Sequence, residues 1–168
     1  IMLPKKDGWT VVTRDRGLTA VPAHGWDPVT VPGAVAAWTD LHARFGRLPL
    51  SRVVEPAASY ADEGFPVSPV IATTWRREVG RWTPSDATAA FGPLFAPDGR
   101  APAAGERWRA PDLAASLRAI GGTGGRSFYT GELAERIVAF ARATGGALAA
   151  SDLADHRSEW VEPLSVSY

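Results

Sequence analysis

Residues 31–67, VPGAVAAWTDLHARFGRLPLSRVVEPAASYADEGFPV, predict two amphipathic helices joined by a short turn. In the first helix, large apolar side chains recur at steps of three, three and four residues, at Val35, Trp38, Leu41 and Phe45. This spacing places the four side chains on one face of a helix. We expect that face to be buried, and we expect Gly46 to end the helix in a left-handed conformation.

The second helix of this stretch has Ser51 as its expected N-cap and Gly64 as its end. Its apolar side includes Val54 and Ala61. Pro56 lies inside the run and has no N–H to donate to the helix. We therefore expect one opening turn, a break, and a main helix that starts at Pro56.

The rest of the chain predicts more helices and little strand. The expected helices lie at residues 69–82, 85–90, 111–120 and 130–144, with a single turn from Ser151. Residues 91–108 are rich in Gly, Pro and Ala and predict a long surface connection. The last residues, 158–168, predict a strand. The expected total is five or six helices with one or two strands.

Composition excludes several classes of function. The 168 residues include 18 Lys and Arg against 18 Asp and Glu, so no net charge favours nucleic acid or an anionic membrane as a partner. The absence of Cys excludes disulfides, thiolate metal sites and a Cys nucleophile. No apolar run approaches the roughly 20 residues that cross a bilayer.

The candidate sites are weak when each is taken by itself. Residues 121–126, GGTGGR, lack the Lys-Ser/Thr pair of a phosphate-binding loop and predict a helix cap instead. His156 follows Asp152 by four residues, but a metal site needs a third ligand, and none lies nearby in the sequence. His24 lies in a Pro/Gly loop, and His42 is expected on a helix surface.

Paired carboxylates and serines also give no clear catalytic group. Asp62 and Glu63 are adjacent, so they point to different sides of a helix and are expected to be solvated. The serines are better explained as helix caps. A self-contained hydrolase would need a serine within hydrogen-bond reach of His156. We therefore predict no catalytic residue and no metal site in this chain.

Two ordered blocks of sequence resemble the large subunit of the γ-glutamyltransferase family. The first joins VPGAVAAW to FGRLPLSRVVEPAASYADEGFPVS, with Phe45 at the place of the more usual Tyr. The second is FYTGELAERIVAFARATGGALAASDLADHRSEWVEPLSVSY, residues 128–168. Together they cover about half of the chain, which is more specific than a single short motif.

The resemblance implies a mainly helical part of an αββα sandwich of the N-terminal-nucleophile hydrolase type. It implies acyl transfer from a γ-glutamyl or related amide, such as glutathione or a β-lactam side chain, to water or an amino acid. The nucleophile would be an N-terminal Thr outside this chain, with no metal or organic cofactor. The family's Arg for the substrate α-carboxylate lies in an R-x-x-AP-type motif, which neither Arg14 nor Arg16 matches.

The same resemblance implies partners. These are the rest of the large subunit and the small catalytic subunit of one precursor, together with a small γ-glutamyl substrate. We expect residues 1–29 to be an irregular segment and residues 30–168 to be part of one incomplete domain, since both ends look cut from a longer chain. The alternative is a non-catalytic helical interaction module, which would expose no apolar face.

Overall fold

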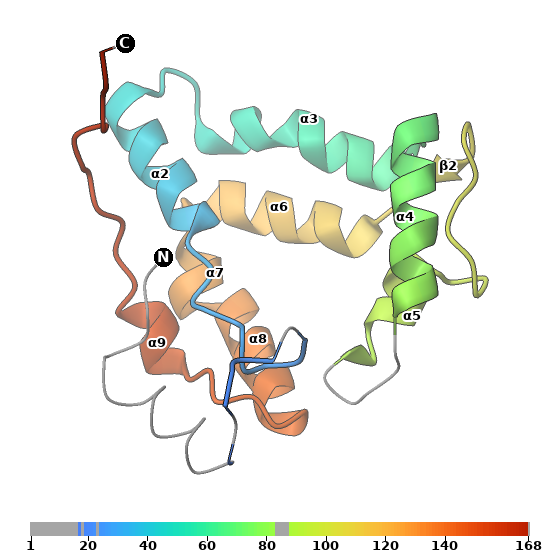
Figure 1. Cartoon of the computed structure of the whole chain (residues 1–168). Coiled ribbons are helices and arrows are strands. Elements are labelled where there is room, and N and C mark those ends of the chain that lie inside the picture. Colours follow the sequence, from blue (N-terminus) through green and yellow to red (C-terminus); the bar gives the residue numbers. More distant parts are fainter. Residues whose placement is uncertain (1–16, 18, 23, 83–87, 168) are drawn as a thin grey trace.

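The computed structural model describes residues 17, 19–22, 24–82 and 88–167, and this part of the chain is mainly helical (Figure 1). Its elements are α2 (Ala34–Phe45), α3 (Leu50–Glu63), β1 (Phe65–Pro66), α4 (Pro69–Arg81), α5 (Phe91–Phe95), β2 (Arg107–Trp108), α6 (Pro111–Thr123), α7 (Arg126–Thr130), α8 (Glu132–Ala143) and α9 (Ala150–Ala154). These eight helices exceed the predicted five or six because α5, α7 and α9 are short segments of five residues each.

The centre of the molecule is the antiparallel pair of α3 and α6 (Figure 1). Small side chains form its core, since Ala58, Ala61 and Ala114 are buried together. At one end of the pair the Ala110 N–H donates to the carbonyl of Ala61, at 2.7 Å. Alanines allow two helices to approach closely, so the core is thin but tightly packed.

The predicted break at Pro56 is wrong, because α3 runs without interruption from Leu50 to Glu63. Proline removes only one helical hydrogen bond, and buried side chains lie on both sides of it, at Val54 and Ala58. Packing against α6 thus holds both halves in one helix. The start is also different, since Pro49 occupies the N-cap position that we assigned to Ser51.

Gly121 lies inside α6 and not in a terminal cap as predicted for the glycine-rich run. A Cβ atom at this position would lie 2.6 Å from Val54 Cγ2 and 2.9 Å from Ser51 Cα. The missing side chain is therefore what permits the crossing with α3. The predicted cap is found three residues later, where Gly124 has a left-handed conformation with φ of 61°.

Aromatic side chains join α4 and α5 to the small β ribbon. The ribbon pairs Phe65 with Trp108 in antiparallel register. The Trp75 ring lies 5.0 Å from that of Trp108, and Trp75 Nε1 donates to the carbonyl of Phe95 at 2.8 Å. Residues 91–108 were predicted to be a surface connection, but they contain α5 and β2 because these aromatic contacts order them. The predicted helix at 85–90 begins outside the described residues.

The helix predicted at 130–144 is found as α8, which starts at Glu132 because the chain breaks at Gly131, and the short helix α7 before it was not predicted. The backbone of Gly131 is extended, with φ of −126° and ψ of −155°. A Cβ there would lie 3.0 Å from Ser127 Cα, which is a tight approach, so glycine suits the turn between the helices. These two helices and α9 form a second group of helices below α2 in Figure 1.

The α2 helix has the predicted periodicity, but its apolar face is not buried as predicted. Of the four residues, only Val35 is buried, whereas Trp38, Leu41 and Phe45 are exposed. Gly46 also differs from the prediction, since its backbone is extended with φ of −70°. The chain supplies no element large enough to cover this face within the part that the structure describes.

The predicted C-terminal strand is not formed among the described residues. Residues 156–167 contain no assigned strand and run as an irregular segment from α9 along α2 (Figure 1). The two strands found, β1 and β2, lie elsewhere and pair only with each other. Among the described helices, none has the length and apolar character needed to cross a membrane.

Candidate functional site

Tyr129 and His156 form a polar cluster where α7, α9 and the start of α2 meet. The Tyr129 hydroxyl donates to the carbonyl of Pro32 at 2.8 Å and accepts from the N–H of Ala36 at 2.9 Å. The His156 ring stacks on Tyr129 with the ring centroids 5.5 Å apart. Gly33 also lies close to the His156 ring, since a Cβ at Gly33 would be 3.2 Å from His156 Nε2. The cluster therefore fixes the entry into α2.

The environment of Tyr129 keeps its hydroxyl protonated. Burial raises the pKa of this phenol above its ordinary value, and the negative charge of Asp40 acts in the same direction. The hydrogen bond from Ala36 lowers the pKa, but by less than burial raises it. A protonated hydroxyl that is bonded to two backbone groups serves as a structural link between segments, and it offers no nucleophile or base.

His156 does not form a catalytic pair with a serine in this structure. Its Nδ1 atom is buried without a hydrogen-bond partner among the described residues, and so is Ser158 Oγ two residues later. Asp152, the other predicted neighbour, instead accepts from the N–H of Ala149 at 2.8 Å and caps α9. The described residues therefore do not form the Ser–His hydrogen bond that a self-contained hydrolase requires.

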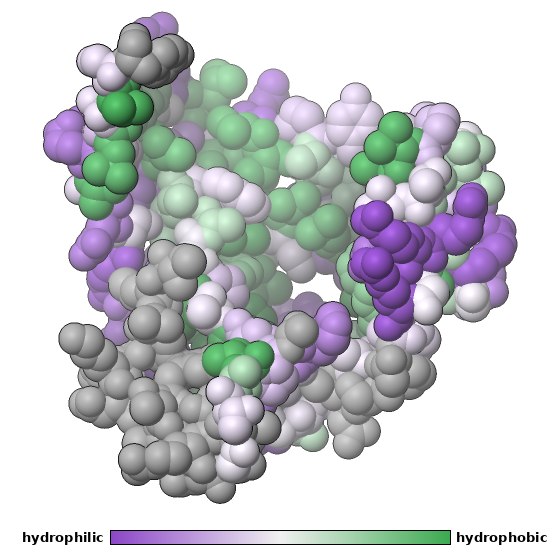
Figure 2. All heavy atoms as spheres, in the orientation of Figure 1, coloured by the Kyte–Doolittle hydropathy of each residue, from purple (hydrophilic) through white to green (hydrophobic). Residues whose placement is uncertain are grey.

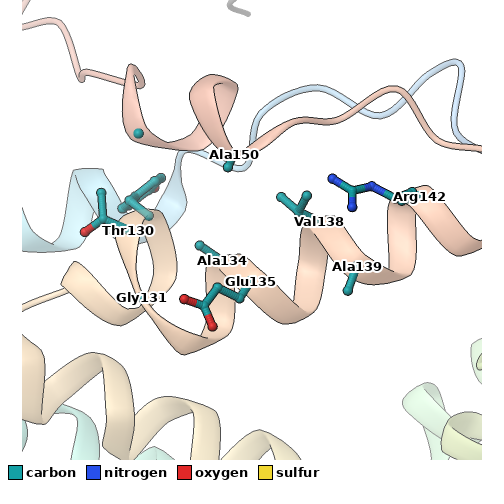
Figure 3. Close-up of a pocket in the computed structure, with 10 residues that line it drawn as sticks. Thr130, Gly131, Ala134, Glu135, Val138, Ala139, Arg142 and Ala150 are labelled. Atoms are coloured by element: carbon teal, nitrogen blue, oxygen red, sulfur yellow. The ribbon is translucent and has the colours of Figure 1, made fainter.

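A pocket of about 430 Å³ lies between α7, α8 and α9 (Figure 3). In that view Val138 and Arg142 project from α8 on the side that faces Ala150. Its walls are mainly small apolar residues, and the Thr130 hydroxyl at one end donates to the carbonyl of Arg126 at 3.3 Å. The residues that line the pocket include no nucleophile next to a base, so the pocket is not arranged for hydrolysis.

Two acidic residues of α3, Glu55 and Asp62, form ion pairs with Arg118 of α6. Arg118 lies 3.1 Å from Glu55 and 3.0 Å from Asp62, and these hydrogen bonds raise the pKa of the arginine. Arg109 also approaches Asp62, at 3.7 Å. Glu63 stays exposed on the next position of the helix. The carboxylates thus link the two central helices, and they do not form a catalytic dyad.

The remaining candidates are separate from one another. His24 lies in an exposed bend, and His42 Nε2 donates to the carbonyl of Leu48 at 2.6 Å. The described residues contain no group of three His, Asp or Glu side chains that a metal ion would need. Arg14 and Arg16 lie outside the described residues.

Sequence reasoning missed the Tyr129–His156 cluster. Tyr129 and His156 are far apart in the sequence, and both are still farther from Gly33. No local periodicity therefore indicates that the three residues meet. The only signal was the family resemblance, whose first block contains Gly33 in VPG at 31–33 and whose second block, residues 128–168, contains both Tyr129 and His156. That resemblance gave no role to either side chain.

Comparisons with known proteins agree on one family. The gamma-glutamyltranspeptidase family model matches residues 5–168. The chain is 39% identical over 160 residues to the glutathione hydrolase-like YwrD proenzyme of Bacillus subtilis, covering 94% of this chain and 30% of that protein. It is 35% identical to the acylase ACY 1 proenzyme of Pseudomonas sp. strain SE83, covering 93% of this chain and 27% of that protein. The chain thus spans about 30% of the length of these relatives.

Solved structures give the same result. The fold matches the cephalosporin acylase of Bacillus halodurans with a TM-score of 0.92 and 43% identity, over 99% of this chain and 32% of that chain. It matches the gamma-glutamyltranspeptidase of Pseudomonas nitroreducens with a TM-score of 0.83 and 28% identity, over 99% of this chain and 48% of that chain. The chain belongs to the γ-glutamyltranspeptidase family.

Proposed function

We propose that this chain is the helical scaffold of a γ-glutamyltransferase-like enzyme whose nucleophile, an N-terminal Thr, lies outside residues 1–168. The match of the family model to almost the entire chain carries this proposal. The relatives include enzymes named as glutathione hydrolases and as acylases, so the transferred group is γ-glutamyl or a related acyl group. The described residues of this chain add no competing nucleophile–base pair.

The reaction that we propose is acyl transfer in two steps. The Thr hydroxyl attacks the carbonyl of a γ-glutamyl or related amide, and its own α-amino group accepts the proton. Donors aimed at the developing oxyanion stabilise the tetrahedral intermediate, and the amine leaves with that proton. Water or an amino acid then attacks the ester and releases the acyl group. The residues of this chain bind none of the reacting atoms in this proposal and act as support.

We place residues 30–168 in one incomplete domain of the large subunit and treat residues 1–29 as an irregular segment. In an αββα sandwich the helices of this chain would form an outer layer. Residues 156–167 would join a sheet completed by other parts of the polypeptide, and their exposed apolar side chains at Val161, Leu164 and Val166 support this placement.

The alternative, a self-contained interaction module, fits the structure less well. Such a module would cover its apolar surface, whereas α2 and α4 both expose large apolar side chains, including Leu41 and Ile71. Monomeric proteins rarely leave large contiguous apolar patches uncovered. The exposed faces therefore favour a part of a larger assembly over an independent module.

The test is to express the complete reading frame that contains this chain and to assay γ-glutamyl-p-nitroanilide, with and without an amino acid acceptor. We expect the processed protein to release p-nitroaniline, and the isolated 168-residue chain to release none. A glutaryl amide assayed in parallel distinguishes a glutamyl-specific enzyme from an acylase. Turnover of either amide by the isolated chain would refute the proposal, as would an inert processed protein.

A further inference from the structure

The pocket between α7, α8 and α9 has an acidic and a basic side chain on the same face of α8. Glu135 and Arg142 both line it, and they are seven residues apart in the sequence. Because seven residues make almost two full turns of an α-helix, the two side chains leave α8 in nearly the same direction. Their Cα atoms are about 10 Å apart along the helix axis. One wall of the pocket therefore carries two opposite charges at a spacing that the helix fixes.

Neither of these charges has a partner among the described residues. The side chains of Glu135 and Arg142 form no ion pair and no hydrogen bond with another residue of this part of the chain. Arg118, in contrast, is bonded to two carboxylates. Both side chains of the pocket are exposed, so a solute can reach them. A ligand with one ammonium and one carboxylate group would supply both partners at once.

The surface between the two charges is apolar. Val138 lies between them on α8, three residues after Glu135 and four before Arg142, and Ala150 and Ala154 of α9 also line the pocket. In Figure 3 the Arg142 side chain extends along α8 toward Val138. The volume of about 430 Å³ lies in the range of small-molecule sites, about 300–1,000 Å³. The pocket thus fits a ligand with an apolar middle.

The larger recess of the molecule has a different chemistry. Figure 2 shows mainly apolar side chains in the recess over α2, α3 and α6. Such a surface favours apolar contact, whereas a few charged groups at the ends of an apolar pocket fix the orientation of a small ligand. The combination of charge and apolar wall is what distinguishes the pocket beside α8.

We propose that this pocket binds a linear zwitterion, a small molecule whose ammonium and carboxylate groups are separated by an apolar chain. The ammonium group pairs with Glu135. The carboxylate accepts hydrogen bonds from the guanidinium of Arg142, and the apolar chain lies against Val138. An α-amino acid whose charges are on neighbouring atoms is too short to reach both side chains. The site is separate from the proposed acyl transfer, since it contributes no group to that reaction.

The test titrates three ligands into the complete protein that contains this chain, by isothermal titration calorimetry at low ionic strength. ε-Aminocaproate carries both charges, hexylamine carries only the ammonium group, and caproate carries only the carboxylate. Each ligand is also titrated into Glu135→Gln and Arg142→Gln. Glu132→Gln and Arg136→Gln are the matched controls, because these exposed residues of α8 do not line the pocket. Thermal unfolding shows whether each variant is folded.

We expect wild type to bind ε-aminocaproate at least about threefold more tightly than hexylamine or caproate, because each exposed charge contributes modestly to binding. In Arg142→Gln, ε-aminocaproate and hexylamine should bind equally, since the carboxylate has lost its partner. In Glu135→Gln, ε-aminocaproate and caproate should bind equally for the corresponding reason. Both control variants should keep the preference of wild type.

Absence of binding to folded wild type would overturn the proposal. An unchanged preference in folded Arg142→Gln or Glu135→Gln would also overturn it, because the ligand would then bind elsewhere. If Arg142→Gln unfolds the protein, Arg142→Met replaces it and is judged in the same way. These readouts do not depend on turnover, so failure of this proposal is distinguishable from failure of the proposed function.

Discussion

Tyr129 shows how a single side chain links segments that are far apart in the sequence. Its hydroxyl bonds to backbone groups of Pro32 and Ala36, and its ring supports His156. The Ala36 N–H lies in the first turn of α2 and the Pro32 carbonyl lies just before it. Backbone groups at the start of a helix lack hydrogen-bond partners within the helix. A side chain that forms hydrogen bonds with such backbone groups stabilises the fold by more than its packing alone.

Replacement of Tyr129 by Phe is expected to lower the free energy of unfolding by about 1–2 kcal/mol, because a half-buried donor and acceptor lose their partner. Urea denaturation of the protein measures this change. Tyr60→Phe is the control, since Tyr60 is exposed, and it is expected to change stability by less than about 0.5 kcal/mol. Equal losses in the two variants would show that the hydroxyl of Tyr129 does not link the segments.

The raised pKa of Tyr129 predicts a loss of stability at alkaline pH. Because the pKa of this phenol is higher in the folded state, its contribution is complete below the unfolded value of about 10 and is lost as the pH rises through the folded value. The difference in unfolding free energy between wild type and Tyr129→Phe should therefore shrink above pH ~10. A difference that stays constant across this range would contradict the assigned environment.

At the scale of elements, the crossing of α3 and α6 depends on small residues. Gly121 lies against Val54 and the backbone of Ser51, and alanines fill the rest of the contact. The ion pairs from Arg118 to Glu55 and Asp62 lie on the exposed edge of the same pair of helices. Exposed ion pairs contribute little, so close packing is the main support of this crossing.

Gly121→Ala is expected to destabilise the protein by about 1–2 kcal/mol, because overpacking at a backbone contact outweighs the better helix propensity of alanine. Gly122→Ala is the matched control, since it is the next residue in α6 and its Cβ would meet nothing within 4 Å. That control is expected to stabilise the protein by about 0.5–1 kcal/mol. Thermal unfolding of both variants measures the contrast, and a stabilising Gly121→Ala would mean that the helices are not in close contact.

Local patterns predicted the helices well, and long-range contacts explain the errors. The spacing from Val35 to Phe45 predicted α2, and the helix predicted at 69–82 is α4, where the Ser68 side chain accepts from the Ile71 N–H at 3.3 Å. Pro56 was misjudged because packing on α6 keeps α3 continuous. The Tyr129–His156 cluster could not be predicted, since its members come from three separate parts of the chain.

At the scale of the whole molecule, the structure resembles one side of a larger protein. The core between α3 and α6 is thin, and large apolar side chains remain exposed on α2, α4 and the C-terminal segment. The family match and the short span relative to the curated relatives agree with that picture. The proposed catalytic centre outside this chain agrees with the described residues, in which His156 stacks on Tyr129 and Glu55 and Asp62 pair with Arg118.

The central claim is that these helices support a catalytic Thr that they do not contain. The most direct measurement treats the processed proenzyme with an electrophilic γ-glutamyl analogue and locates the covalent adduct by peptide mass spectrometry. The account predicts one adduct, on the N-terminal Thr of a segment outside residues 1–168, and loss of activity in proportion to labelling. An adduct on a serine or on His156 of this chain, with the same loss of activity, would contradict the account.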